Sequence, residues 1–127
     1  WSPLAGGLLT GKYRKGQKAP EGSRMAKWQD RYERFDQEPR NWAIVDALVA
    51  VAEAVDRPPS QVALAWLLHK EAVCSVIMGA RTVAQLEENL GAADLDLQAA
   101  HLQQLDEASA IPLGYPYDFI SRVDERW

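Results

Sequence analysis

The 127-residue sequence has one cysteine, fewer basic than acidic side chains and no long hydrophobic run. The single Cys74 excludes a disulfide within the chain and any zinc site built from several cysteines. Lysine and arginine number 14 against 18 aspartates and glutamates, and this net charge of −4 argues against a nucleic-acid partner. No apolar stretch approaches the ~20 residues of a transmembrane helix, and nothing at the start resembles a signal peptide. We therefore expect a soluble, cytoplasmic protein without a membrane partner.

The start of the chain lacks an initiator methionine, since the first residue is Trp1 and the first methionine is Met25. The opening residues read as the end of an apolar strand with nothing in front of it. We therefore interpret the chain as a piece of a longer polypeptide. Its length and ordinary globular composition fit one domain. Residues 1–127 are predicted to form a single partial domain, without internal repeats or linkers.

The first 40 residues carry few signals of regular structure. Trp1–Leu4 is predicted to end a strand that Pro3 stops, and a glycine-rich turn follows over residues 5–13. Residues 14–39 are polar and interrupted by glycine and proline, which predicts a long loop with a short helix near residues 25–35. Loops of this length inside compact domains are usually functional or disordered.

Beyond residue 40, apolar side chains recur at helical spacing. We predict an amphipathic helix over residues 41–55, which the Pro58-Pro59 pair ends, and a second helix over residues 61–70 with Ser60 as its N-cap. The short, β-branched run 73–78 predicts a fully buried parallel strand. A last helix is expected over residues 98–109.

Between the strand and the last helix, the sequence carries a turn and a helix start. Gly79-Ala80-Arg81 makes the turn, and Thr82 and Gln85 fit a capping box for a helix that ends near Gly91. Its apolar residues are expected to face the core: Val83, Leu86 and Leu90. Alternation of buried strands with helices predicts an α/β architecture with parallel strands. Because two strands cannot form a parallel sheet covered on both faces, the chain is predicted to be part of a larger sheet.

The turn and helix over residues 79–89 form the first candidate site. A helix start that follows a strand directs several backbone N–H groups and the positive end of the helix dipole outward. Arg81 beside it can bind a phosphate bidentately, while Gln85, Glu88 and Asn89 could hydrogen-bond a base or a ribose. The alternative is a plain turn with a solvated Arg81 and with Asn89 as a helix cap.

The glycine-rich segment from Ser2 to Lys12 is the second candidate site. Its glycines allow backbone to approach a ligand closely, and Lys12 supplies a charge suited to phosphate. The nucleotide-binding pattern G-x-x-x-x-G-K-[ST] is not completed, because Tyr13 stands where serine or threonine is required. The alternative is a merely flexible loop. Both candidate sites follow the carboxyl ends of predicted parallel strands, where barrel and open α/β folds bind ligands.

Two motifs in this order resemble a known family. Trp1–Tyr13 (WSPLAGGLLTGKY) resembles the strand-seven signature of the aldo-keto reductases. Val76–Thr82 (VIMGART), with the Gln85-Leu86 and Glu88-Asn89 pairs, resembles their strand-eight signature, and residues 95–97 and 105–108 match the helix that usually closes that fold. The long loop and the tail around Tyr115 resemble the bacterial members related to the voltage-gated potassium channel beta subunits.

The resemblance implies a fold and an activity. The fold would be the C-terminal portion of a (β/α)8 TIM barrel, about the last two strands with their helices, which is incomplete on its own. The parent protein would be an NADP-dependent oxidoreductase that reduces an aldehyde or a ketone. The alternatives are an NADPH-binding regulatory or sensor module, and an inactive truncated fragment that pairs with the missing N-terminal part or with another chain.

The resemblance also assigns cofactor-binding residues. The pyrophosphate would lie along the first segment and near Lys12: Ser2, Pro3, Leu4, Ala5 and Gly6. Arg24 in the long loop would fold over the cofactor. The adenosine end would be held by the second segment: Gly79, Arg81, Gln85, Glu88 and Asn89. With Arg81 on the 2′-phosphate, NADPH is favoured over NADH.

No catalytic residue is assigned in this chain, because the family's catalytic Asp, Tyr, Lys and His lie on early strands that precede Trp1. The four tyrosines, at positions 13, 32, 115 and 117, have no assigned partner. His69 and His101 are expected to be solvent-facing or capping, and their separation argues against a metal site. Cys74 in the predicted strand is expected to be an inert core thiol.

Overall fold

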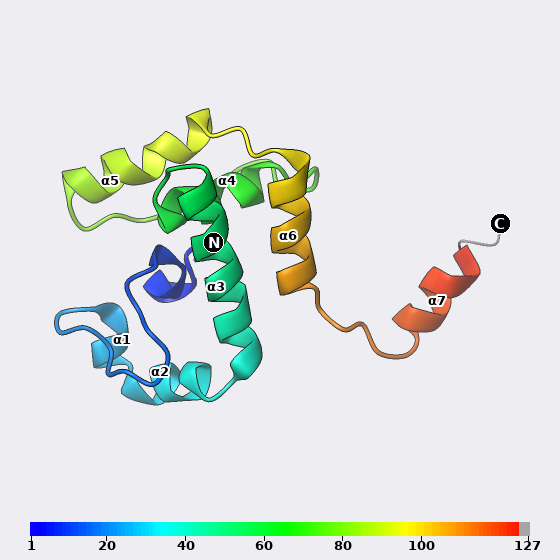
Figure 1. Cartoon of the computed structure of the whole chain (residues 1–127), viewed down its shortest axis with the longest axis horizontal. Helices are drawn as coiled ribbons and strands as arrows, with labels where there is room; N and C mark the ends of the chain where they lie inside the picture. The colour runs from blue at the N-terminus through cyan, green and yellow to red at the C-terminus, as the bar shows by residue number, and fades with distance from the viewer. Residues whose placement is uncertain (125–127) are drawn as a thin grey trace.

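The described part of the chain consists of helices joined by irregular segments. A computed structural model describes residues 1–124, except for the side chains of Ser121 and Asp124. Figure 1 shows α3 crossing the body of the molecule and α7 standing apart from it. The elements are η1 (Ala5–Thr10), α1 (Arg24–Lys27), α2 (Gln29–Asp36), α3 (Pro39–Ala54), α4 (Pro59–Leu68), α5 (Val83–Leu90), η2 (Gly91–Asp94), α6 (Ala99–Ser109) and α7 (Tyr117–Asp124).

The predicted strands are wrong. Residues 73–78 have no regular structure, and Ile77 is 69% exposed rather than buried. Trp1–Leu4 enters a turn in which Ala5 N donates to Ser2 O at 2.9 Å. Because no strand occurs among residues 1–124, the predicted α/β class and the C-terminal portion of a TIM barrel are contradicted. A strand needs neighbouring strands to pair its backbone groups, and this chain offers only two short candidates, far apart in sequence. Cys74 is therefore exposed and not a core thiol.

Helix α3 confirms the predicted helix over residues 41–55 and begins two residues earlier. Glu38 is its N-cap and accepts a hydrogen bond from Arg40 N at 3.3 Å. Pro39 occupies the first helical position, where the missing N–H costs no hydrogen bond. The helix is followed by Asp56, Arg57 and two prolines, which cannot continue its ladder.

Two apolar clusters meet on α3. The first joins its C-terminal half to α4 and α6 and comprises Leu48, Val51, Ala52, Val62, Ala63, Ala65, Leu97 and Leu105. The second joins its N-terminal half to η1, α1 and α2 and comprises Leu8, Tyr13, Met25, Tyr32, Trp42 and Val45. Burial of each large side chain of this kind stabilises the fold by about 1.5–3 kcal/mol. The predicted helix near residues 25–35 exists, although Trp28 divides it into α1 and α2.

Helix α4 holds α5 through two polar side chains. It begins at Pro59 with Pro58 as N-cap, so the prediction of Ser60 as its cap is wrong. Ser60 Oγ instead donates to Glu88 Oε1 at 2.8 Å, and Gln61 Nε2 donates to the Glu88 carbonyl at 2.7 Å. Ser60 and Gln61 are both buried, so these bonds replace the water that the side chains lose on folding.

The start of α5 contains the predicted capping interaction between Thr82 and Gln85. Gln85 N donates to Thr82 Oγ1 at 3.2 Å, and Gln85 Oε1 accepts from Arg81 N at 3.0 Å, one residue before the expected donor. The apolar side of the helix, however, points outward and contradicts the prediction: Val83 is 71%, Leu86 42% and Leu90 53% exposed. The face that packs on α4 carries Glu88 and the buried Asn89.

Polar contacts hold α6 against α3 and α4. Arg40 Nη2 donates to the carbonyls of Ser109 and Ala110 at 2.9 and 2.8 Å, which caps the C-terminal end of α6. Asp106 accepts from Trp66 Nε1 at 2.7 Å and forms an ion pair with Lys70. None of the described helices combines the length and apolarity needed to cross a bilayer.

Gly91→Ala is expected to lower the free energy of unfolding by about 1–3 kcal/mol. A Cβ at Gly91 would lie 2.6 Å from Gln61 Nε2, so the methyl group would displace the side chain that joins α4 to α5. Urea unfolding followed by circular dichroism measures the change. Gly79→Ala is the matched control, since a Cβ there meets nothing within 4 Å. Equal losses in the two variants would contradict this packing.

The stability should also depend on the protonation of His69. Its Nδ1 contacts the Ala65 carbonyl at 2.8 Å and its Nε2 contacts Asp96 Oδ1 at 3.1 Å. Both nitrogens can donate only in the imidazolium form, so Ala65 first and Asp96 second raise the pKa of His69 above 6.5. This stabilisation is complete below the unfolded pKa and is lost as pH rises through the folded pKa.

Urea unfolding at about pH 5.5 and about pH 8.5 measures this contribution. We expect His69→Gln to lose stability relative to the wild-type chain at the lower pH and to lose less at the higher pH. A destabilisation by His69→Gln that is the same at both pH values would show that the charge of His69 does not contribute.

Candidate functional site

The structure brings three of the predicted ligand segments to one side of α3 (Figure 1). Gly6 in η1 lies against α1, because a Cβ at Gly6 would stand 2.5 Å from Met25 Cε and 3.8 Å from Arg24 Cδ. Arg81, before α5, reaches the loop that precedes α1, where its Nη1 donates to the Gly22 carbonyl at 3.5 Å. The glycine turn thus packs against α1, and Arg81 links the segment before α5 to the loop before α1.

The glycine turn uses several of its own amides. Gly7 N donates to the Leu4 carbonyl at 2.8 Å, and Leu9 N donates to the same oxygen at 3.3 Å. Gly6 and Gly7 have φ values of 72° and 99°, a backbone region that glycine adopts without strain. These internal bonds leave the Gly7 and Leu9 amides unavailable to a ligand. The turn can therefore contribute to ligand binding through close approach of its glycine backbone and through the charge of Lys12.

Lys12 and Tyr13 converge on Gly7 from the end of this turn. The exposed Lys12 ammonium lies 5.3 Å from the centroid of the Tyr13 ring, a cation–π contact. A Cβ at Gly7 would be 3.4 Å from Lys12 Nζ and 3.7 Å from the Tyr13 hydroxyl. Tyr13 is 1% exposed, and its hydroxyl has no hydrogen-bond partner within residues 1–124.

Arg24 stands at the surface beside an aromatic ring. Ser23 Oγ caps α1 by accepting from Ala26 N at 3.2 Å, which places Arg24 in the first turn of the helix. The guanidinium groups of Arg24 and Arg31 lie 5.5 and 5.4 Å from the Trp28 ring. Lys12, Arg24 and Arg81 therefore contribute positive charge from three different elements.

The other residues predicted to bind the cofactor are less available for ligand contacts. Gln85 Oε1 is engaged by Arg81 N, the Glu88 carboxylate accepts from Ser60, and Asn89 is buried. Gly79 is surrounded by open space, so the structure shows no steric reason for glycine there. Of the first segment, Ser2 and Ala5 adopt positive φ values of 55° and 49°, Pro3 is half-buried, and Leu4 packs against the first apolar cluster.

No catalytic group emerges from the other titratable residues that the structure describes. Tyr32 donates to the carbonyls of Arg14 and Gln17, and burial first, then the charge of Asp36, raises its pKa. His69 contacts a carbonyl of its own helix, as expected of a capping residue, whereas His101 is half-buried rather than solvent-facing. The described residues contain no group of three or more metal-binding side chains.

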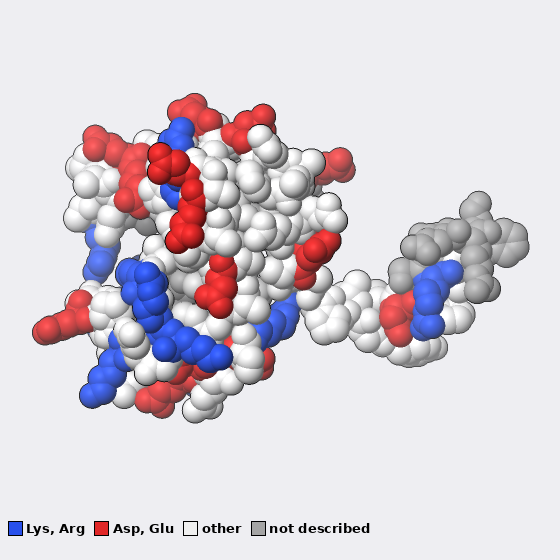
Figure 2. All heavy atoms as spheres, viewed as in Figure 1, with Lys and Arg blue, Asp and Glu red and all other residues white. Residues whose placement is uncertain are grey.

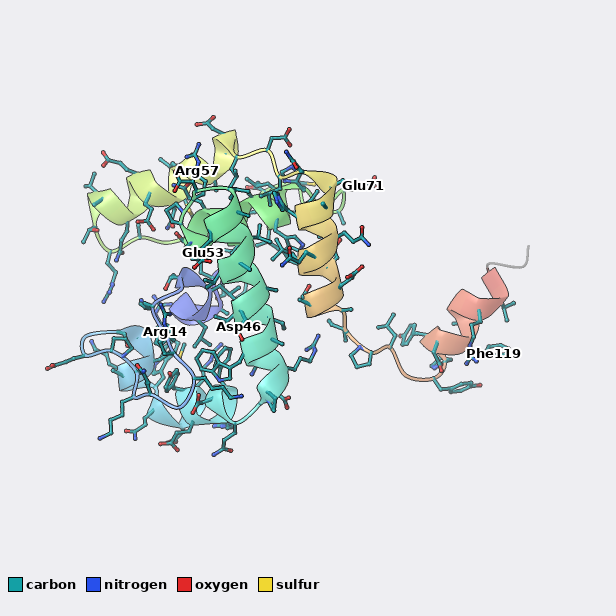
Figure 3. All side chains as sticks on the ribbon, viewed as in Figure 1. Arg14, Asp46, Glu53, Arg57, Glu71 and Phe119 are labelled. Carbon is teal, nitrogen blue, oxygen red and sulfur yellow. The ribbon has the colours of Figure 1, made fainter. Side chains whose placement is uncertain are left out.

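Two open hollows border these segments. One, of about 390 Å³, lies among the loop at residues 16–19, α1 and α2. The other, of about 530 Å³, lies between residues 10–14 and α3, where Arg14, Glu53 and Arg57 follow one side of the helix (Figure 3). Neither contains a predicted ligand residue. The face shown in Figure 2 mixes acidic and basic side chains, without a single dominant basic area.

Sequence reasoning missed two side chains of this region. The sequence assigns no ligand role to Tyr13, yet its hydroxyl is buried beside Gly7. Ser60, predicted to be a helix cap, instead donates a hydrogen bond to Glu88. Charged neighbours in the sequence, Lys12 and Arg14, give no sign that Tyr13 is buried, and no local pattern identifies a contact between residues 60 and 88.

Comparison with known proteins agrees with the two signatures. The model of the Aldo/keto reductase family matches residues 1–110. The chain is 37% identical over 112 residues to the Schizosaccharomyces pombe protein named "Putative voltage-gated potassium channel subunit beta", covering 84% of this chain and 32% of that protein. It is 35% identical over 117 residues to aldo-keto reductase str7 of Strobilurus tenacellus, covering 88% and 34%.

A third relative is L-glyceraldehyde 3-phosphate reductase of Escherichia coli O157:H7, which is 37% identical over 111 residues, covering 84% of this chain and 32% of that protein. The chain thus spans about a third of the length of these relatives. Both candidate ligand segments, Ser2–Lys12 and Gly79–Asn89, lie inside the residues that the family model matches. Because that match covers most of its length, the chain belongs to the aldo/keto reductase family.

Proposed function

We propose that this chain supplies the phosphate-binding part of an NADPH site in a cytoplasmic oxidoreductase that reduces an aldehyde or a ketone. The observation that carries the proposal is the placement of three cations: Lys12 and Arg24 lie beside the glycine turn, and Arg81 contacts the loop before α1. Membership of the aldo/keto reductase family and the reductase names of two relatives support it.

Each segment would hold a different part of the cofactor. The pyrophosphate would lie along Ser2–Gly6 with Lys12 beside it, and Arg24 would reach over it from α1. Arg81 would bind the 2′-phosphate, because a guanidinium group donates two parallel hydrogen bonds to phosphate oxygens. The adenosine would lie at Gly79, Gln85, Glu88 and Asn89, where Gln85 and Glu88 must exchange internal hydrogen bonds for ligand contacts.

When bound, NADPH supplies the hydride, and this chain's residues bind and orient it. The chain spans about a third of its relatives, and we assign the groups that meet the carbonyl to a segment outside it. That segment would belong either to the same polypeptide or to another chain. The 127 residues alone are expected to bind NADPH without consuming it.

A regulatory NADPH-binding module is the second candidate. It is favoured by the Schizosaccharomyces pombe relative, whose name describes a channel subunit. In that case NADPH would act as a bound ligand that stabilises the protein, and no carbonyl compound would be reduced.

Arg81→Ala is expected to weaken NADP+ binding by tenfold or more. The reason is that a hydrogen bond to a charged group contributes about 1.5–3 kcal/mol. Isothermal titration calorimetry of the chain with NADP+ and with NAD+ measures the effect, and NAD+ affinity should not change. Arg34→Ala is the matched control, because Arg34 is also an exposed arginine but lies on α2. Equal NADP+ affinities for Arg81→Ala and the wild type would remove the 2′-phosphate assignment.

A chimera tests the proposed role in catalysis. In it, this chain replaces the aligned segment of the Escherichia coli relative, and reduction of L-glyceraldehyde 3-phosphate by NADPH is measured. We expect activity, and we expect Arg81→Ala to raise the KM for NADPH about tenfold with a smaller effect on kcat, because Arg81 would contact the cofactor away from the hydride.

The unmodified relative is the positive control for this chimera. A folded chimera that binds NADPH without reducing the substrate would favour the regulatory candidate. A folded chimera that does not bind NADPH would contradict both candidates.

A further inference from the structure

The hydroxyl of Tyr13 is buried without a partner among the described residues, which is unusual for a polar group in a folded protein. Nearby Tyr32 provides the comparison, since the two rings lie 5.4 Å apart in the same apolar cluster. The Tyr32 hydroxyl donates to the carbonyls of Arg14 and Gln17 at 3.2 and 3.0 Å. A phenylalanine would fill the Tyr13 position equally well if only the ring mattered.

The position of this hydroxyl connects it to the glycine turn. It lies 3.7 Å from the point where a Cβ at Gly7 would be, and Lys12 Nζ lies 3.4 Å from the same point. Gly7 keeps this point free of a side chain. Two donors, one of them charged, therefore lie within 4 Å of one point, and an acceptor with several oxygens and negative charge would satisfy both.

We infer that the Tyr13 hydroxyl is a further ligand contact, which donates to a phosphate oxygen of the bound dinucleotide beside Lys12. The inference rests on the proposed NADPH site. Lys12 is exposed and has a flexible four-carbon stem, so its ammonium, which lies 5.3 Å from the centroid of the Tyr13 ring, can move toward the phosphate and leave room beside that ring. Tyr13 then gains the hydrogen bond that it lacks in the ligand-free chain.

Tyr13→Phe tests this role because it removes the hydroxyl and keeps the ring. Thermal unfolding of the ligand-free chain should show a Tm equal to or above that of the wild type, because the substitution removes a buried hydroxyl that has no hydrogen-bond partner among the described residues. Titration with NADP+ and with inorganic pyrophosphate should show affinities about tenfold lower for both ligands. Stability and affinity would thus change independently.

Tyr32→Phe is the matched control. It removes a hydroxyl that has two partners, so Tm should fall while the affinity for NADP+ stays within about twofold of the wild type. Unchanged affinity in Tyr13→Phe would overturn the inference. A reduced Tm together with reduced affinity in both variants would also overturn it, because general loosening of the cluster would explain both effects.

The same titrations separate this inference from the proposed function. If Arg81→Ala weakens NADP+ binding and Tyr13→Phe does not, the NADPH site stands and the role of Tyr13 fails. If the wild-type chain binds neither NADP+ nor pyrophosphate, the proposed site fails and the inference fails with it.

Discussion

Burial of α3 from two directions is the constraint on which the other elements depend. Its C-terminal half carries Leu48 and Val51 into the cluster with α4 and α6, while its N-terminal half carries Trp42 and Val45 into the cluster with η1, α1 and α2. Neither group of elements could bury its apolar residues without this helix. Because Leu8 of η1 and Met25 of α1 belong to the second cluster, the core fixes the glycine turn and α1 relative to each other.

Close approaches at glycine then set how the elements meet. A Cβ at Gly6 would collide with Met25, and a Cβ at Gly11 would lie 2.8 Å from Pro59 Cγ at the start of α4. Gly11 also has a φ of 75°, which adds a backbone requirement to the steric one. The glycine turn is therefore fixed at one end against α1 and at the other against α4. This fixation distinguishes it from the merely flexible loop that the sequence also permitted.

Local signals in the sequence predicted local structure well. The spacing of apolar residues in α3, α4 and α6 and the Thr82–Gln85 capping box depend on neighbours within one or two turns, and the structure contains them. The strand at 73–78 and the inward face of α5 depended on partners elsewhere, and the described chain supplies none. Likewise, the link between Arg81 and Gly22 joins residues 59 positions apart, and no pattern around either residue encodes it. The family resemblance identified the candidate ligand residues, whereas their internal hydrogen bonds became visible only in three dimensions.

The internal bonds of Gln85 and Glu88 have a consequence for selectivity. A ligand that hydrogen-bonds to Gln85 or Glu88 must first break an internal hydrogen bond of that side chain. The net binding free energy from contacts to a base or a ribose is therefore small. Arg81 and Lys12 have no carboxylate partner in the described residues, and their attraction to added negative charge has no such competitor. Such a surface would select ligands mainly by their number of negative charges, and replacing one base by another would change the affinity little.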